Sequence, residues 1–255
     1  MKCVFIILIF CFISIKSYAQ IVSTSASDLY IDSTGWQAKV DLYIYNSHNV
    51  VNVFNFVAGS QVQYLKGKHR FLSVNAIRQM IVRSDGKESD DDQAVQHFRY
   101  NYIISHKWEI ESFLQGQYNE PLRIGFRGLA GIGARMVFHK NEKDYFYTGL
   151  GPMFDHEQEV GNGIITNEYR ANAYIALKRD FSEKISASLN TYYQPRFIKI
   201  DDYRASIGGV FNIKATKHLG LKTVLNLNYD SSPVEDPDIS GFTYSFIMGL
   251  YFKIH

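Results

Sequence analysis

The segment from Leu122 to Phe138, LRIGFRGLAGIGARMVF, alternates between apolar residues and residues that are charged or small. A period of two residues is that of a β-strand, with one apolar face and one face that carries three arginines and three glycines. On a helix, Arg123, Arg127 and Arg135 would be scattered among the apolar side chains. A strand of 17 residues also far exceeds the roughly 5–6 residues usual in soluble proteins. Such strands are typical of transmembrane β-barrels.

The first 19 residues show the three parts of a secretory signal peptide. Lys2 precedes an apolar run from Cys3 to Ile15, and the small-residue site Ser17-Tyr18-Ala19 follows, so we expect cleavage before Gln20. The apolar run is too short for a comfortable membrane anchor. A lipoprotein, in which Cys11 would be the modified residue, is disfavoured because bulky Phe10 precedes it.

Composition excludes several classes of protein. Both cysteines lie in residues 1–19, so the mature chain would contain neither disulfides nor reactive thiols. Removal of Lys2 and Lys16 leaves 25 basic and 25 acidic residues, and this zero net charge argues against a nucleic-acid-binding protein. No later apolar run approaches the length of a transmembrane helix, which argues against a helical inner-membrane protein. The 18 Tyr and 18 Phe residues fit an outer-membrane barrel.

Alternation continues from Gly35 to the C-terminus and predicts twelve strands. We expect residues 20–34 to form a periplasmic lead-in and residues 35–255 a single antiparallel barrel in the outer membrane of a Gram-negative bacterium. Long connections follow the third, seventh, ninth and eleventh strands, including loops at 83–93 and 155–167, as expected for the outer side of the membrane. The first and fifth strands depart from this rule. A soluble sandwich or lipocalin-like barrel would not need this asymmetry and would bury its apolar face on shorter strands.

The polar face of the predicted strands would line the barrel interior. Pairing around the turn at 105–107 sets Asn101 beside Glu111, and pairing across 120–122 sets Gly133 opposite Glu109 with Arg135 diagonal, so ion pairs can form. The charged residues expected in the lumen, nine basic and three acidic, are Arg99, Glu109, Glu111, Arg123, Arg127, Arg135, Glu168, Arg170, Lys178, Arg204, Lys214 and Lys222.

This charged inner face allows two interpretations. A network of ion pairs would fill the lumen and close it, whereas the basic excess would make a narrow pore that favours anions. We favour the closed lumen, because twelve strands enclose less space than the strands of large porins.

Neither metal nor catalytic chemistry is indicated. The run Asp90-Asp91-Asp92, with Glu88 before it, offers oxygen ligands for Ca²⁺ but lacks the spacing of a calcium loop, and we interpret it as a solvated loop. A known twelve-stranded outer-membrane phospholipase uses a histidine and a serine two residues apart on a strand, and this sequence contains no His-x-Ser. His97, the one histidine on a predicted strand, is expected to form hydrogen bonds in the lumen. We therefore expect no cofactor, no metal and no enzymatic activity.

Several features between His97 and Glu159 form a pattern: an aromatic-rich strand, Arg127 followed by Gly131 and Gly133, and Gly149-Leu150-Gly151-Pro152 with Glu157 after it. In these features the chain resembles the domain-of-unknown-function 481 family, sometimes labelled salt-induced outer-membrane proteins. The family has no established activity, so the resemblance implies a barrel fold and an outer-membrane location without specifying any chemistry. The chain departs from other outer-membrane barrels at its end, Lys253-Ile254-His255, which lacks the terminal aromatic residue that the assembly machinery reads.

The function expected from the sequence is structural, or a role in envelope stress, for a barrel with a largely closed polar lumen. A small anion-favouring pore is the alternative, and an outer-membrane hydrolase is the least favoured. The expected partners are outer-membrane lipids and, during insertion, the barrel-assembly machinery. We expect no nucleic-acid partner, and the sequence indicates no protein partner.

Overall fold

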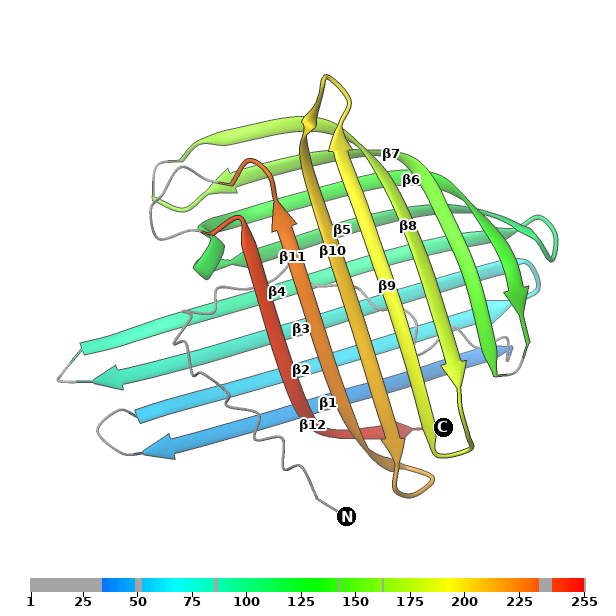
Figure 1. Cartoon of the computed structure of the whole chain (residues 1–255), viewed down its shortest axis with the longest axis horizontal. Helices are drawn as coiled ribbons and strands as arrows, with labels where there is room; N and C mark the ends of the chain where they lie inside the picture. The colour runs from blue at the N-terminus through cyan, green and yellow to red at the C-terminus, as the bar shows by residue number, and fades with distance from the viewer. Residues whose placement is uncertain are drawn as a thin grey trace, which may run out of the picture.

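The computed structural model describes residues 34–48, 52–84, 87–141, 143–161, 163–233 and 240–254. The signal peptide expected at residues 1–19, and all but Thr34 of the expected lead-in, lie outside the described residues. Twelve antiparallel strands close into one barrel, each beside its neighbours in sequence, with β1 next to β12 (Figure 1). The predicted twelve-stranded antiparallel barrel is therefore confirmed. Among the described residues, no helix has the length and apolar character needed to cross a membrane.

The strands contain between 12 and 17 residues. Front and back walls cross at a steep angle in Figure 1, as the tilt of strands in a closed barrel requires. The strands are Gly35–His48 (β1), Asn52–Lys66 (β2), His69–Ser84 (β3), Lys87–Ile103 (β4), Trp108–Asn119 (β5), Ile124–Lys140 (β6), Asp144–Glu159 (β7), Ile165–Asp180 (β8), Ile185–Arg196 (β9), Lys199–Lys214 (β10), Leu219–Asp230 (β11) and Phe242–Ile254 (β12). One 3₁₀ turn, η2 (Glu120–Leu122), connects β5 to β6.

The period-two pattern of the sequence becomes an apolar outer face and a mainly polar inner face. On β6, the side chains of Phe126, Ile132 and Phe138 are exposed on the outside, while Arg127 and Arg135 are buried inside. Large apolar residues are exposed in the same way on every strand. A surface of this kind is stable against lipid and not against water, as in outer-membrane barrels.

The interior also contains apolar layers. Phe113, Leu129 and Met153 form one buried cluster. Leu72 and Val74 of β3 form another, which fixes the phase of a strand whose sequence pattern is ambiguous. These side chains occupy lumen space that a wide channel would leave to water.

Two predicted loops are wrong, because strands extend through most of their length. Asp90, Asp91 and Asp92 lie in β4, paired in register with β3, and residues 155–159 complete β7. Only residues 85–86 separate β3 from β4, so the predicted asymmetry of loop lengths is largely absent. The longest connection, residues 231–241, joins β11 to β12. Charged residues at these positions suggested loops. At 155–159 the alternate charged residues Asp155 and Glu157 face the polar lumen, which is compatible with a strand, whereas residues 87–92 extend the β3–β4 hairpin past the end of β5.

The glycines of the family pattern lie side by side on β6 and β7. A Cβ atom on Gly133 would come within 2.9 Å of the Leu150 carbonyl oxygen, and one on Gly151 would overlap the Ile132 carbonyl oxygen. On the lumen side, the ring of Tyr174 occupies the space beside Gly149. Only glycine permits backbones and rings to approach this closely.

Candidate functional site

Two networks of ion pairs lie in the lumen at different heights. We call the first the inner network: Arg70, Arg99, Glu109, Glu111, Arg135 and Tyr174. We call the second the mouth network: Arg127, Asp155, Glu157, Glu168, Arg170, Arg196, Asp202, Arg204 and Asp230. Together they draw on β3 to β11, so segments far apart in sequence meet inside the barrel.

The inner network is centred on Arg135 of β6. Its guanidinium Nη2 donates to Glu111 Oε2 at 2.8 Å, Nη1 lies 3.4 Å from Glu109 Oε2, and Nε donates to the Tyr174 hydroxyl oxygen at 2.9 Å. Tyr174 in turn donates to Glu111 at 2.7 Å. None of the charged side chains in this network is more than 4% exposed. A buried network of this quality holds its strands in one arrangement.

Arg70 and Arg99 complete the inner network from neighbouring strands. Arg70 Nη1 donates to Glu109 Oε1 at 3.1 Å, and Arg99 Nη1 lies 3.9 Å from Glu111 Oε2. The Arg99 guanidinium also lies 5.6 Å from the ring centroid of Tyr174, within cation–π range. The network therefore links β3 and β4 to β8 through the side chains of β5 and β6.

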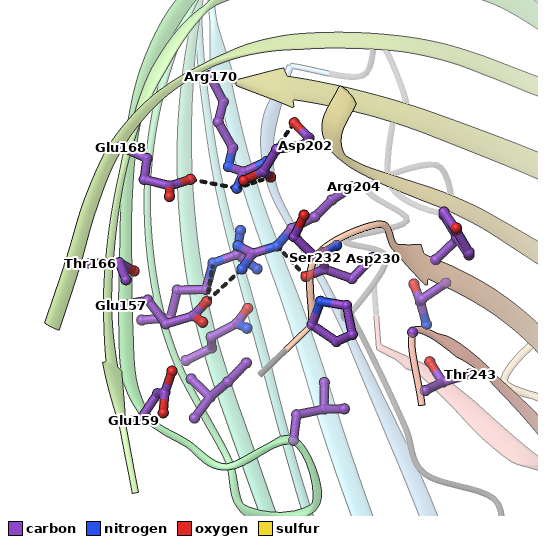
Figure 2. A pocket seen from close by; sticks show the side chains of 18 of the residues that line it. Glu157, Glu159, Thr166, Glu168, Arg170, Asp202, Arg204, Asp230, Ser232 and Thr243 are labelled. Atoms are coloured by element: carbon purple, nitrogen blue, oxygen red, sulfur yellow. Dashed lines mark hydrogen bonds and ion pairs between the residues drawn. The ribbon is translucent and has the colours of Figure 1, made fainter. Parts of the chain in front are cut away.

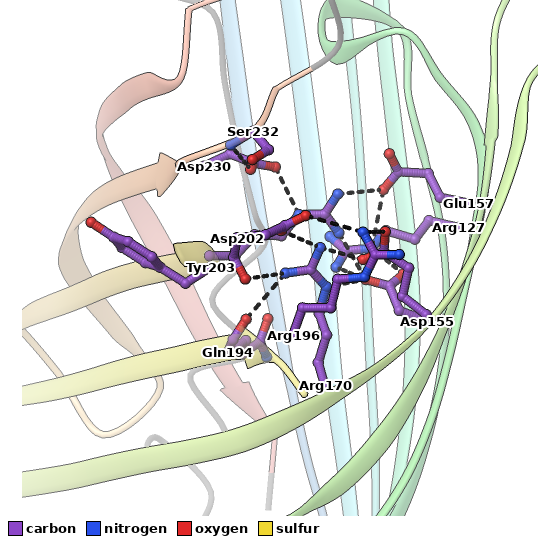
Figure 3. Close-up of polar contacts among 12 residues, drawn as sticks. Arg127, Asp155, Glu157, Arg170, Gln194, Arg196, Asp202, Tyr203, Asp230 and Ser232 are labelled. Carbon is purple, nitrogen blue, oxygen red and sulfur yellow. Dashed lines mark hydrogen bonds and ion pairs between the residues drawn. The ribbon is translucent and has the colours of Figure 1, made fainter. Parts of the chain in front are cut away.

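The mouth network is centred on Asp155 of β7 (Figure 3). Its carboxylate accepts from Arg127 Nη2 at 2.6 Å and from Arg204 Nη1 at 2.8 Å. Arg204 extends outward to Asp230, with Nε to Oδ2 at 2.7 Å. Exposure of the side chains rises along this path from 3% at Asp155 to 25% at Asp230, so the network passes gradually into solvent.

A second branch of the mouth network connects β8, β9 and β10. Arg170 Nη2 donates to Asp202 Oδ1 at 2.8 Å and to Glu168. Arg196 lies 3.0 Å from Glu168 and 3.4 Å from Asp202. Each guanidinium thus contacts two carboxylates, which fits the fork of donors that arginine presents.

Apolar and neutral groups separate the two networks. Phe113, Leu129 and Met153 pack together, and His97 stacks on Phe113 with 5.7 Å between ring centroids. His97 Nδ1 is hydrogen-bonded to Gln115 Oε1 at 3.0 Å. This layer and the charges on both sides of it occupy the lumen beside β4 to β7, and a small cavity of about 130 Å³ lies next to Asp41, Gln61 and Lys222 on the other side.

A further buried ion pair lies where the barrel closes. Lys222 of β11 donates to Asp41 of β1 at 2.8 Å, across the intervening β12. Asp41 also lies 3.9 Å from Lys39. The contact connects the first and penultimate strands and supports closure of the sheet.

The mouth network forms the floor and wall of an open cavity of about 450 Å³, which we call the mouth cup (Figure 2). It lies at the end where η2 and the β7–β8 and β11–β12 connections are found. Apolar residues complete the wall: Leu122, Ile124, Ile164, Tyr229 and Pro233.

At the opposite end, where β1 begins and β12 ends, the lumen opens into a larger cavity of about 1010 Å³, which we call the vestibule. Its lining includes His106, Lys107, His139, Lys140, Lys143 and Lys178, with Glu109 and Asp144 as its acidic members. The vestibule and the mouth cup share no lining residue. The two networks therefore lie between two cavities of different charge.

The structure places most of the predicted lumen charges inside the barrel. Eight of the twelve are buried: Arg99, Glu109, Glu111, Arg127, Arg135, Arg170, Arg204 and Lys222. Glu168 and Lys178 are partly buried, near the mouth cup and in the vestibule respectively.

Two of the predicted lumen residues are not in the lumen. Arg123 is exposed, because the chain leaves η2 through it in a left-handed conformation with φ of 55° before β6 begins. Lys214 is exposed as the last residue of β10. Both residues continue the alternating pattern of the sequence. The pattern does not indicate that β6 begins after Arg123 and that β10 ends at Lys214.

Several charged lumen residues were missed by sequence reasoning. Arg70 follows Lys66-Gly67-Lys68-His69, a run typical of a turn, and Asp155 and Glu157 lie in a predicted loop, yet all three are buried. With Lys39, Asp41 and Asp202 they raise the buried set among the described residues to eight Lys and Arg and six Asp and Glu. A basic excess is present, but it is much smaller than the predicted excess of nine basic residues over three acidic ones. Met153, Asp155 and Glu157 are spaced two residues apart and all face inward. This spacing was the sequence signal that would have identified Asp155 and Glu157 as lumen residues.

The predicted register is right on one side of β5 and wrong on the other. Asn101 lies opposite Glu111, as predicted from the turn between β4 and β5. Glu109, however, lies opposite Arg135 rather than Gly133. An irregularity between Gln117 and Asn119, followed by η2, shifts the pairing by two residues and brings the charges of Glu109 and Arg135 directly together.

Comparison with known proteins agrees with this architecture. Residues 51–252 match the family described as "Protein of unknown function, DUF481". The chain belongs to this family. The pattern that suggested it is explained by the structure, because Arg127 and Glu157 pair across β6 and β7, beside the glycines. No curated protein matches the sequence.

Solved structures with a similar fold are outer-membrane proteins. The chain covers 99% of the NanC porin with 86% of its own length, at 8% identity and a TM-score of 0.51. It covers 92% of the translocator domain of the autotransporter NalP from Neisseria meningitidis with 89% of its own length, at 8% identity and a TM-score of 0.52. At such low identity the likeness shows the fold alone, an outer-membrane-type β-barrel.

Proposed function

We propose that this DUF481 protein is a structural barrel of the Gram-negative outer membrane whose polar lumen is closed to ions. The observation that carries the proposal is the inner network, in which Arg135 and Glu111 join charged residues of four strands, β3 to β6, to the hydroxyl group of Tyr174 on β8. The apolar layer at Phe113 and Met153 adds buried side chains inside the barrel, which supports a lumen too narrow for ions.

An outer-membrane location is supported by the apolar outer face and by the signal peptide expected from residues 1–19. Because the number of strands is even, both ends of the barrel sheet lie at the vestibule. In bacterial outer-membrane barrels that end faces the periplasm. The proposed orientation therefore puts the vestibule in the periplasm and the mouth cup outside the cell.

Outer-membrane lipids and, during insertion, the barrel-assembly machinery are the proposed partners. The proposal includes no catalytic step. His97, the histidine considered for catalysis, is buried between Phe113 and Gln115 and hydrogen-bonded to the amide of Gln115. A hydrogen-bonding role in the lumen accounts for it.

Conductance across planar bilayers tests the closed lumen. Purified, refolded protein, shown to be folded by a heat-modifiable band on a gel, is added to bilayers that separate two salt concentrations. We expect no steady current. Stable single-channel currents would overturn the proposal, and a reversal potential shifted toward that of the anion would favour the alternative, a small anion-selective pore.

A variant with a cleared lumen serves as the positive control. Replacing Glu111, Arg135 and Tyr174 together by serine removes one negative and one positive group with the ring between them, so the net charge is preserved. We expect this triple variant to conduct where the wild-type protein is silent. If the wild-type protein conducts as well as the variant, the inner network does not close the lumen.

A further inference from the structure

The mouth cup carries more negative than positive charge. Among the described residues, its lining and the network beneath it contain six carboxylates and four guanidinium groups, a formal balance of two negative charges, and the described lining includes no lysine or histidine. Asp230, at the edge of the cup, has 25% of its side chain exposed, so the negative charge of the cup reaches the solvent. A cleft lined by an excess of one sign of charge concentrates ions of the opposite sign.

An independent feature of the cup is the side chain of Asn228, on the inner face of β11. Asn228 lines the cup and is only 5% exposed, and neither its Oδ1 nor its Nδ2 has a hydrogen-bonding partner among the described residues. A buried polar group without a partner costs about 1–3 kcal/mol. Native proteins rarely leave such groups without a ligand or an ordered water molecule.

The neighbouring residue Asn226 provides an internal comparison. It lies on the same face of β11, two residues earlier, and is similarly buried at 7% exposed. Its Nδ2 donates to Ser245 Oγ at 3.2 Å within the barrel wall. Asn228 has no such contact, so its donor and its acceptor are both available at the cup.

We propose that the mouth cup binds a small organic cation that also carries hydroxyl or carbonyl groups. The ammonium group lies among the carboxylates, and a hydroxyl or carbonyl group uses the hydrogen-bonding capacity of Asn228. The volume of about 450 Å³ is within the range of small-molecule sites, and Leu122, Ile124 and Pro233 provide apolar contact. The proposal is independent of the closed lumen, because a ligand can bind at the mouth whether or not ions pass below it.

Three sugars of similar size and different charge test the charge preference. Glucosamine, glucose and glucuronate are titrated into the folded full-length protein in detergent at low salt, with binding followed by calorimetry. We expect glucosamine to bind at least tenfold more tightly than glucose, and glucuronate not to bind. Absence of glucosamine binding, or binding of glucuronate at equal strength, would overturn the proposal and leave water as the partner of Asn228.

Two variants test the role of Asn228. Asn228→Leu has nearly the same volume without polar atoms, and we expect it to weaken glucosamine binding at least fivefold while the barrel stays folded. Asn226→Leu, the matched control, should leave that binding unchanged. Equal weakening by both substitutions, or none by Asn228→Leu, would contradict the assignment. If Asn228→Leu does not fold, the ranking of the three sugars on the wild-type protein remains a complete test.

Discussion

The inner network and the mouth network use the same chemistry in different surroundings. Both contain an arginine, Arg135 in one and Arg170 in the other, that donates hydrogen bonds to two or more acceptors. In the inner network the charged side chains are at most 4% exposed, whereas in the mouth network exposure reaches 27% at Arg196. The inner network is therefore almost fully buried, with Glu109 at the edge of the vestibule, and the mouth network is continuous with solvent.

This difference in burial assigns different roles to the two networks. A buried charge that loses its partner has no water to replace it, so the inner network behaves as a rigid unit. A partly exposed charge is stabilised by solvent whichever partner it has, so the mouth network tolerates rearrangement. The inner network is suited to closing the lumen, and the mouth network to accepting a ligand.

The largest expected effect is the loss of Arg135. Arg135→Met preserves much of the side-chain volume but leaves Glu109 and Glu111 facing each other with less positive charge. We expect a loss of about 3–5 kcal/mol in the free energy of unfolding. Urea unfolding in lipid vesicles, followed by the fluorescence of Trp36 and Trp108, measures it. A loss below 1 kcal/mol would show that the inner network is not isolated from water.

A smaller effect is expected where the inner network depends on a glycine. In Gly149→Ala the added methyl group overlaps the ring of Tyr174, which must move away from Glu111 and Arg135. Overpacking of this kind costs about 1–3 kcal/mol. Gly116→Ala is the control, because its Cβ would have only one neighbour, the Phe126 ring, at 3.6 Å. Equal unfolding midpoints for the two variants would contradict the proposed dependence.

At the mouth, Asp230→Asn should have a still smaller effect. The substitution removes one partly exposed charge, and Arg204 keeps Asp155 at 2.8 Å and Glu157 at 3.1 Å. We expect a loss below about 1 kcal/mol in the same unfolding assay. A loss as large as that of Arg135→Met would remove the distinction between the two networks.

The smallest effect is expected at the rim of the barrel. Arg179 and Asp144 lie 4.0 Å apart with side chains 70% and 30% exposed. Arg179→Ala should change the free energy of unfolding by about 0.5 kcal/mol or less, because an exposed pair is screened by water and salt. A clear destabilisation would show that exposure does not set the order of these effects.

The barrel itself was predictable from sequence, because alternation reports directly which residues face lipid and which face the lumen. Trp36, Leu42 and Ile44, for example, share one parity of the alternation in the first strand and are exposed on its outer face. The ends of strands were not predictable in the same way. Asp155 and Glu157 suggested a loop, since their polarity alone does not distinguish a loop from an inward strand face.

The partners within the networks were the least predictable part. Register gives the neighbour on the adjacent strand, as for Asn101 and Glu111. The contact between Arg204 of β10 and Asp155 of β7 crosses the lumen between strands that are not adjacent. Such contacts depend on the curvature of the closed sheet and on which side chains reach across it, and neither is encoded in a local pattern.

The close approach of β6 and β7 at Gly133 and Gly151 has a consequence for evolution. A side chain at either position would meet the backbone of the other strand, so neither glycine can be replaced unless the partner strand also changes. The two positions are expected to vary together in related sequences. Related barrels that have lost one of these glycines would then carry a compensating change on the opposite strand, such as a bulge or a shift in register. In a sequence alignment, the residues at these two positions would then indicate how closely β6 and β7 approach each other in each member of the family.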